Sequence, residues 1–311
     1  MFLSNMMTAL NQVIILYIIV AVGFACHKIG IYTEKASRMT TDLLFYIITP
    51  AMIIRSFIAI PFSRESLKGR GLSFLAALIF HGIGILLSEL VFCKTEQSKA
   101  SIYKFAAVYG NVGYMVLPLA EGLLGDEGVF YCSVIVIPFN ILAFTHGIRI
   151  MTKGEKGSKI SLKSLIVNPG FIGIAIGLPL FLLKLNLPQT LYMPLSYIAD
   201  LQTPLAMLMF GTYLASADIK KVFSDYRVFV CLAVKLFAMP LLTVLSLKLL
   251  GFGGMLLVAC VLSASAPTAN NTVMFAAKFN KDTALASSVT AFISLISIFT
   301  MPLMVAIAQS V

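Results

Sequence analysis

Long apolar runs without charged residues govern what this chain can fold into. Residues 1–27 contain no Asp, Glu, Lys or Arg, and neither do residues 249–277 or 283–311. A helix that crosses a bilayer needs about 20 apolar residues. The 311 residues are 59% hydrophobic and 12% charged, whereas soluble domains are about 25% charged. Too few polar residues are present to cover a water-facing surface, so the sequence excludes a soluble globular protein and predicts a membrane protein.

The apolar runs divide into ten segments of membrane-spanning length. Because the runs are continuous rather than alternating, they favour α-helices over a β-barrel. Ten helices with short connections use nearly the whole chain, so we expect an all-α membrane protein without a soluble domain. The predicted helices 1 to 10 are residues 7–29, 40–60, 71–92, 102–120, 128–150, 165–183, 191–217, 226–249, 253–277 and 283–308.

Basic residues are distributed unequally between the two sides of these helices. The chain carries 23 Lys and Arg against 13 Asp and Glu, a net charge of +10. The bases lie between apolar runs rather than in a stripe with aromatics, so they indicate helix orientation and predict no nucleic acid partner. Sixteen flank one side, six flank the other, and Lys235 falls inside a helix. The richer side should face the cytoplasm, which places both termini outside the plasma membrane.

The sequence also reads as two copies of one five-helix unit. The basic segment 151–163 separates five helices from five, and a shift of 154 residues aligns similar positions in the two halves. Because each unit has an odd number of helices, the second copy is inverted in the membrane, as in many secondary transporters. We predict repeats over residues 1–152 and 160–311. The matched positions are Gly23 with Gly177, Thr49-Pro50 with Thr203-Pro204, His81 with Lys235 and, after a one-residue slip, Gly125-Asp126-Glu127 with Asn280-Lys281-Asp282.

Predicted helices 4 and 9 are interrupted at corresponding places. Residues 110–118 read GNVGYMVLP and residues 263–272 read SASAPTANNT. Proline breaks the helical hydrogen-bond pattern, and unwound backbone is tolerated at membrane depth only beside a polar cavity or under protein. Its free N–H groups and the half-helix dipoles favour an anion. The alternative is two proline kinks with asparagines bonding across helices. The candidate substrate-binding residues are Asn111, Gly113, Pro118, Pro267, Thr268, Asn270 and Asn271.

Other polar and proline positions inside the helices are candidates for supporting roles. Pro50 and Pro204 interrupt helices 2 and 7, where they kink a scaffold or edge the substrate cavity. Asp200 and Gln202 lie one turn before Pro204. An intramembrane carboxylate is a functional candidate by default, so we consider a substrate or proton role for Asp200, the alternative being an interfacial or locally bonded group.

His81 and Lys235 occupy equivalent places in helices 3 and 8. Either can titrate or counter an anionic ligand. The alternative is that Lys235 extends to the interface and His81 is a packing residue.

At the breaks the sequence resembles the auxin efflux carrier family, which includes plant PIN carriers and bacterial permeases. Asn111 with Pro118 seven residues later is similar to the helix-4 crossover motif of that family. Residues 266–271 (APTANN), followed by MFAA at 274–277, are similar to the helix-9 motif of its bacterial members. The connection 151–163 lacks the long cytoplasmic loop of many plant carriers, which indicates a bacterial-type organic-anion permease.

The resemblance implies a two-domain transporter. Helices 1, 2, 6 and 7 would form a scaffold that dimerises, and helices 3–5 and 8–10 a mobile transport domain in which helices 4 and 9 cross at their breaks. Asn111 and the helix-9 amides would bind the carboxylate of a substrate such as malate or malonate.

Other classes of function fit the sequence less well. The chain has no HExxH motif, no intact GxGD motif and no paired intramembrane aspartates, so we expect no enzyme. The five cysteines are scattered without CxxC spacing, so we expect neither a metal site nor a cofactor. The remaining alternatives are a sodium-coupled organic-anion symporter of related inverted-repeat fold and a non-transporting membrane sensor.

Overall fold

Helices form every regular element that the structure describes. The computed structural model describes residues 2–59, 62–152, 169–185, 187–216, 222–223 and 225–311, and these contain no β-strand. The prediction of an all-α protein is therefore confirmed, while most of the connection 151–163 lies outside the described residues. The elements used below are α1 (Phe2–Lys28), α2 (Glu34–Leu43), η1 (Leu44–Ile48), α3 (Thr49–Ala59), α4 (Arg64–Val91), α5 (Gln97–Val108), η2 (Val112–Val116), α6 (Leu117–Leu142), η3 (Ala143–Gly147), α7 (Ile148–Met151), α9 (Pro169–Leu182), α10 (Gln189–Asp200), α11 (Gln202–Ser216), α12 (Arg227–Ala233), η5 (Val234–Ala238), α13 (Met239–Leu249), α14 (Gly254–Ala264), α15 (Asn271–Lys278) and α16 (Thr283–Ser310).

Several of these helices have the length and composition of membrane spans. Among the described residues, five helical runs meet both criteria, and three shorter helices are also apolar. The described helices overlap all ten predicted ranges, with predicted helices 2, 4, 5, 7, 8 and 9 each built from more than one element. The five long runs are Lys35–Ala59, Leu67–Val91, Leu117–Met151, Arg227–Leu249 and Thr283–Ser310. These features are those of a multi-pass membrane protein.

Three wide π-helical turns stand immediately before prolines. η1 ends two residues before Pro50, η2 two residues before Pro118, and η5 two residues before Pro240. A proline ring clashes with the carbonyl of the preceding turn and donates no hydrogen bond. A π turn spaces its hydrogen bonds one residue further apart, which gives the ring room without ending the helix. Pro50 and Pro118 therefore do not end the helix in which they lie; each is preceded by a wider π turn that accommodates its ring.

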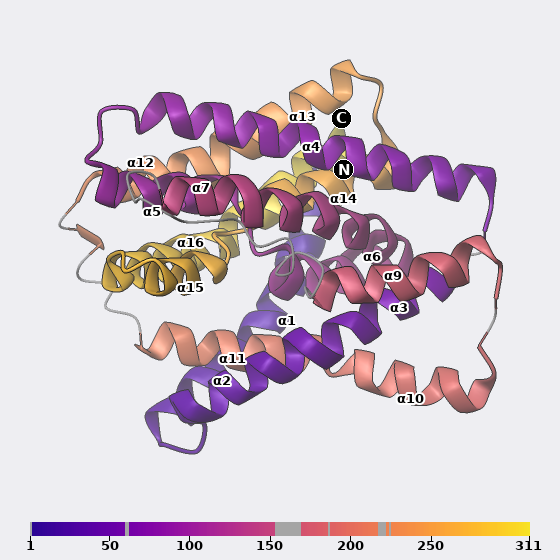
Figure 1. Ribbon diagram of the computed structural model, residues 1–311. Helices are drawn as coiled ribbons and strands as arrows, with labels where there is room; N and C mark the ends of the chain where they lie inside the picture. Colours follow the sequence, from indigo (N-terminus) through magenta and orange to yellow (C-terminus); the bar gives the residue numbers. More distant parts are fainter. Residues whose placement is uncertain (1, 60–61, 153–168, 186, 217–221, 224) are drawn as a thin grey trace.

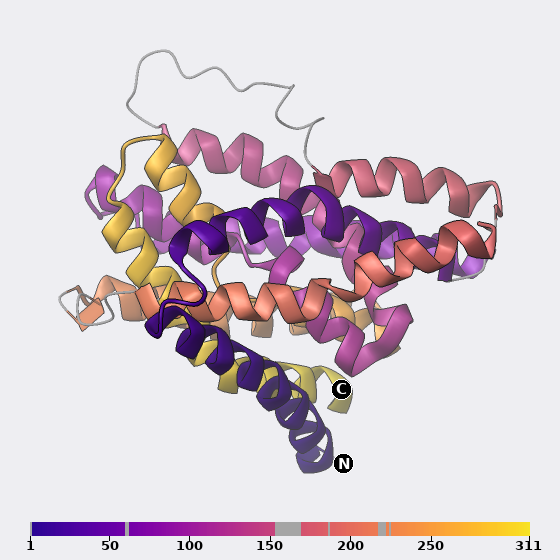
Figure 2. The same ribbon diagram turned by 90° about the horizontal axis from the view of Figure 1, so that it is seen from below.

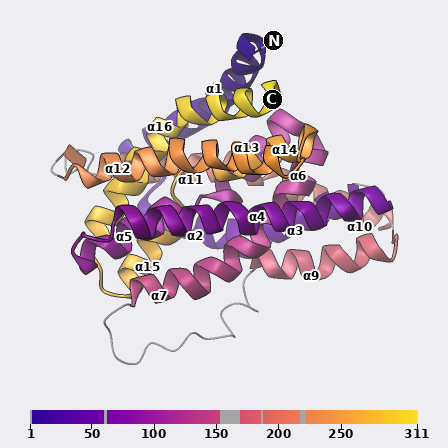
Figure 3. The same cartoon turned by 90° about the horizontal axis from the view of Figure 1, so that it is seen from above.

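The centre of the molecule is occupied by the two interrupted segments. Residues 100–108 of α5 and 257–264 of α14 are all buried. α7 and α9 lie on one face of the bundle, and α1 and α16 lie on the opposite face (Figure 2, Figure 3). The two chain ends lie close together, where α1 packs along α16 (Figure 1).

Two helix pairs pack closely through glycine. α1 packs along α11, where a Cβ on Gly23 would overlap the Leu208 carbonyl and a Cβ on Gly211 would overlap the Val20 carbonyl. α9 packs along α3, where Gly177 lies against Phe57. The two contacts are related by the predicted shift, because residue 23 moves to 177 and residue 57 to 211.

Left-handed backbone also recurs at matched positions. Gly30 and Lys184 have φ values of 80° and 56°, and each lies just after an apolar helix, α1 or α9. Gly125 and Asn280 have φ values of 62° and 49°, and each lies between two helical stretches. The separations are 154 and 155 residues, the same shifts that align the two halves of the sequence.

We predict that Gly211→Ala destabilises the protein, because its new Cβ would overlap the backbone of α1. Overpacking of this kind costs about 1–3 kcal/mol, which thermal unfolding of the purified protein should report as a lower melting temperature. The matched control is Gly82→Ala in α4, where no atom lies within contact of the added Cβ and alanine should be neutral or stabilise by about 0.5–1 kcal/mol. Equal melting temperatures for the two variants would contradict the close packing of α1 on α11.

Candidate functional site

The breaks in predicted helices 4 and 9 lie against each other. Gly110 and Thr268 form an isolated antiparallel pair. The Asn111 N–H donates to the Pro267 carbonyl at 2.7 Å, and the Ala269 N–H donates to the Tyr109 carbonyl at 2.9 Å. Because each break supplies the hydrogen-bond partners of the other, unwound backbone is satisfied inside an apolar bundle. We call these paired segments, residues 109–111 and 266–269, the crossing.

The residue types at the crossing permit this close approach. A Cβ at Gly110 would stand 3.0 Å from both the Cβ of Ala266 and Nζ of Lys235, and 3.2 Å from the Ala266 carbonyl oxygen. These distances are tighter than ordinary contact, so glycine is the residue that fits. Pro267 has no N–H to satisfy, and its carbonyl is the acceptor for Asn111.

Helix ends of both signs point toward the crossing. α5 and α14 end there, with their partially negative C-termini, at Val108 and Ala264. η2, which leads into α6, and α15 begin there, with their partially positive N-termini, at Val112 and Asn271. The helix N-termini, together with amide side chains, are suited to hold a carboxylate.

The predicted substrate-binding residues fall into two groups. Asn111, Pro267 and Thr268 belong to the crossing and are buried, and the Thr268 hydroxyl donates to the Ala106 carbonyl at 3.0 Å. Asn270 and Asn271 are half-buried at the start of α15.

Gly113 and Pro118 follow the crossing and lie outside the pairing itself. The Gly113 carbonyl in η2 accepts from Nε2 of Gln202 at 3.3 Å. Pro118 is the second residue of α6, beyond η2, where it is part of a helix rather than of the extended break.

Lys235 and His81, equivalent in sequence, differ in what they contact. Lys235 lies in η5, its side chain is fully buried, and Nζ lies 3.4 Å from the carbonyl oxygen of Val108, the last residue of α5. The ammonium therefore lies at the crossing rather than at a membrane interface. His81 is also buried, but its Nδ1 lies 2.7 Å from the Ala77 carbonyl of its own helix, and its ring stacks on Phe80.

A cluster of polar and charged side chains joins α3, α6, α10 and α11. The guanidinium of Arg55 in α3 is paired with Asp200 of α10 and lies 2.5 Å from Glu121 of α6. Arg55 is buried, whereas 59% of the Asp200 side chain is exposed. The other Glu121 oxygen accepts from the Thr203 hydroxyl at 3.3 Å. We call these four residues the Arg55 cluster.

The sequence prediction names Asp200 but none of its partners. Arg55 falls inside predicted helix 2, and an intramembrane charge is a signal that needs a partner.

Gln202 links η2, which follows the crossing, to the start of α3. It is fully buried, accepts from the Thr49 hydroxyl at 3.0 Å, and donates to the Gly113 carbonyl. Thr49 and Pro50 begin α3, and Gln202 and Pro204 stand at the start of α11. The π turn of predicted helix 2 and the break in predicted helix 7 are thus connected by side chains to the second half of predicted helix 4.

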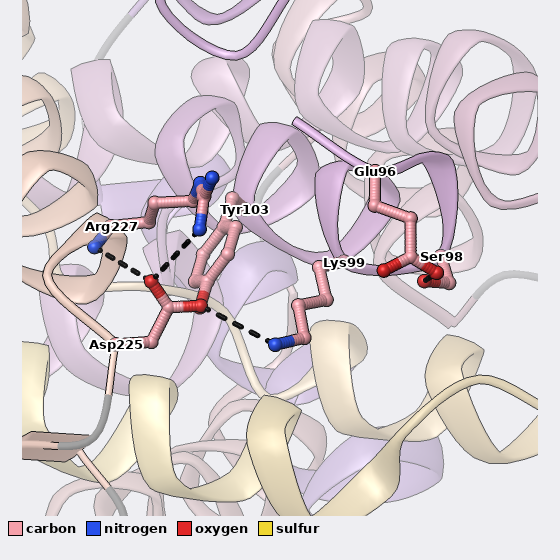
Figure 4. A network of polar contacts seen from close by, with 6 residues as sticks. All are labelled: Glu96, Ser98, Lys99, Tyr103, Asp225 and Arg227. Carbon is pink, nitrogen blue, oxygen red and sulfur yellow. Dashed lines mark hydrogen bonds and ion pairs between the residues drawn. The ribbon is translucent and has the colours of Figure 1, made fainter. Parts of the chain in front are cut away.

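Asp225 anchors the helix that carries Lys235 to the helix that ends at Val108. Its carboxylate accepts from the Tyr103 hydroxyl and the Arg227 N–H, both at 3.0 Å, and lies 3.6 Å from Nζ of Lys99 (Figure 4). Burial acts to raise the pKa of Asp225, but the hydrogen bonds from Arg227 and Tyr103 and the charges of Arg227 and Lys99 outweigh burial and lower it below its ordinary value. This network fixes the start of α5 against the start of α12.

Metal ligands are not gathered at this site. In the part of the chain that the structure describes, no three His, Cys, Asp or Glu side chains are placed to hold a metal ion.

Comparison with known proteins gives matches along nearly the whole chain. A family model described as "Membrane transport protein" matches residues 8–305. An uncharacterized transporter of Methanocaldococcus jannaschii is 28% identical over 224 residues, which cover 69% of this chain and 71% of that protein. A Rhizobium meliloti protein named "Putative malonate transporter" is 22% identical over 295 residues, which cover 91% of this chain and 90% of that protein.

We predict that Asp225→Asn lowers stability in a pH-dependent way. Because the pKa of the folded-state carboxylate lies below the ordinary value of 3.8, ionised Asp225 adds stability above that pH, and this is lost as the pH falls through the folded-state pKa. At neutral pH the variant should lose about 1–2 kcal/mol, and on acidification wild type should approach it. The measurement is thermal unfolding across pH, with exposed Asp126→Asn as the control. A difference between wild type and D225N that persists unchanged in acid would contradict the ionic role.

Proposed function

Because the chain belongs to the membrane transport protein family, in which the auxin efflux carriers are found, we propose that it is a secondary transporter that moves a small organic anion across the plasma membrane by alternating access. The crossing carries this proposal. It brings two helix N-termini and amide-rich chain to one buried place, where irregular backbone is stable only because the two breaks pair.

The proposed architecture has ten membrane helices in two inverted five-helix repeats, residues 1–152 and 160–311. The matched left-handed positions support it, since Gly30 pairs with Lys184 and Gly125 with Asn280 at the shifts seen in the sequence. The related packing of α1 on α11 and of α9 on α3 supports it as well. The distribution of Lys and Arg supports termini that face outside.

The proposed division of labour separates a scaffold from a transport domain. Helices 1, 2, 6 and 7 correspond to α1, α2–α3, α9 and α10–α11, and their glycine-mediated packing suits a rigid scaffold. We propose that two copies of this scaffold form a dimer. The remaining helices contain the crossing and would move as a unit. The hydrogen bond between Gln202 and Gly113 and the Arg55–Glu121 pair join the two parts, so a movement between them must exchange these contacts.

The chemistry of the crossing favours a carboxylate as substrate. Neither interrupted segment contains an acidic residue. The side chains at or next to the crossing are instead a lysine and three amides, namely Lys235, Asn111, Asn270 and Asn271. Asn111 directly precedes η2 and Asn271 begins α15, so their side chains would hold the carboxylate beside the positive helix ends. The malonate transporter named among the relatives makes malonate the first substrate to test.

We predict that Asn111→Ala and Asn271→Ala each reduce uptake of labelled malonate into proteoliposomes by about tenfold or more, because each removes a hydrogen bond to a charged ligand worth about 1.5–3 kcal/mol. The matched control is Gln189→Ala, which removes an exposed amide at the start of α10 and should leave uptake unchanged.

Unchanged uptake in both asparagine variants would contradict the proposed site. Absence of uptake by wild type for every small mono- and dicarboxylate would contradict the proposed function.

A further inference from the structure

Lys235 is a buried ammonium that lies beside the end of α5, inside the bundle. It is carried by a different helix, which runs through α12, η5 and α13, and it lies on the π turn η5 with no exposed surface. Nζ is within 3.4 Å of the Val108 carbonyl oxygen and within 3.6 Å of the Met239 sulfur. Within the described part of the chain, no carboxylate forms an ion pair with it. Its counter-charge is therefore the negative end of α5.

We infer that Lys235 takes the place of a coupling cation at the crossing, so that this protein moves its organic anion without sodium. The inference rests on the proposed function and adds the mode of coupling to it. Unwound carbonyls in a membrane bundle are ligands for a small hard cation. Here the ammonium of Lys235, a side chain of the protein itself, supplies that positive charge.

The carbonyl oxygens at the end of α5 already have protein donors. Phe105 accepts from the Tyr109 N–H at 2.9 Å, Ala106 accepts from the Thr268 hydroxyl, and Tyr109 accepts from the Ala269 N–H. The Val108 oxygen faces the ammonium. A sodium ion at this place would have to displace these donors and would repel the neighbouring ammonium in a medium that screens charge poorly.

The two halves of the crossing are unlike in this respect. The shift of 154 residues relates Lys235 to His81 and Val108 to Leu262. His81 bonds to Ala77 in its own helix and so supplies no such cap. Instead, the hydroxyl of Ser265 donates to the Leu262 carbonyl at 2.9 Å. The C-terminal end of α5 is thus capped by an ammonium and that of α14 by a neutral hydroxyl, so the cationic group lies on one side of the crossing only.

The decisive variant is Lys235→Ala, which frees the Val108 carbonyl and leaves space where the ammonium was. We predict that sodium or methylammonium raises the melting temperature of this purified variant by about 3 °C or more over N-methylglucamine at equal ionic strength, because a ligand that binds only the folded state stabilises it. Wild type should melt equally in all three salts. Lys248→Ala, at the exposed end of the same helix, is the matched control and should show no cation effect.

A melting temperature of wild type that rises with sodium would overturn the inference, and so would a K235A variant that no small cation stabilises. These measurements need no substrate, so they stand apart from a failure of the proposed function.

If K235A does not fold, uptake by the wild-type protein decides. In proteoliposomes at matched membrane potential, malonate uptake should be equal within about twofold with and without a sodium gradient. A tenfold dependence on sodium would overturn the inference, whereas no uptake at all would contradict the proposed function.

Discussion

The hydrogen bonds between the two interrupted segments are the interaction on which the rest of the structure depends. An unpaired backbone N–H or C=O costs several kcal/mol in an apolar interior. The breaks at 109–111 and 266–269 avoid this cost only by pairing with each other. Neither break is stable alone, so the first and second halves of the chain have to assemble together. The buried lengths of α5 and α14 follow from this requirement, because they bring the breaks to the centre.

Side chains complete what the backbone pairing leaves unfinished. Thr268 and Lys235 each supply a donor to a carbonyl near the end of α5, and Gln202 supplies one to η2. The last of these reaches into predicted helices 2 and 7 through Thr49. Polar contacts therefore run from the crossing to the surrounding helices, and they become more exposed toward the Arg55 cluster. This increase in exposure suits a crossing that stays fixed while the more exposed contacts of the Arg55 cluster are exchanged.

The sequence predicted the class of fold and the places of interruption, because apolar run length, proline and glycine act locally. It could not predict which atoms meet, since the pairing of Gly110 with Thr268 is set by tertiary packing. Pro118 illustrates the limit: the proline pattern placed it in the break, but a π turn accommodates it within a helix. Arg55 illustrates a second limit: its partners lie on α6 and α10, which are distant in sequence, so the sequence alone could not identify them. His81 and Lys235 align in sequence, yet only the longer Lys235 side chain reaches the Val108 carbonyl at the end of α5. The His81 ring packs against Phe80, Tyr109 and Phe139 instead.

The π turns also rotate one part of a helix relative to the rest. Each contains one residue more than a regular turn, which turns every later side chain by about 100° about the helix axis. A helical wheel drawn straight through residues 226–249 would therefore misplace the side chains of α13 by about 100° relative to those of α12. In η5 that rotation occurs at Lys235 itself. The face of such a helix on which a side chain lies can be assigned only if residues are counted separately before and after the π turn.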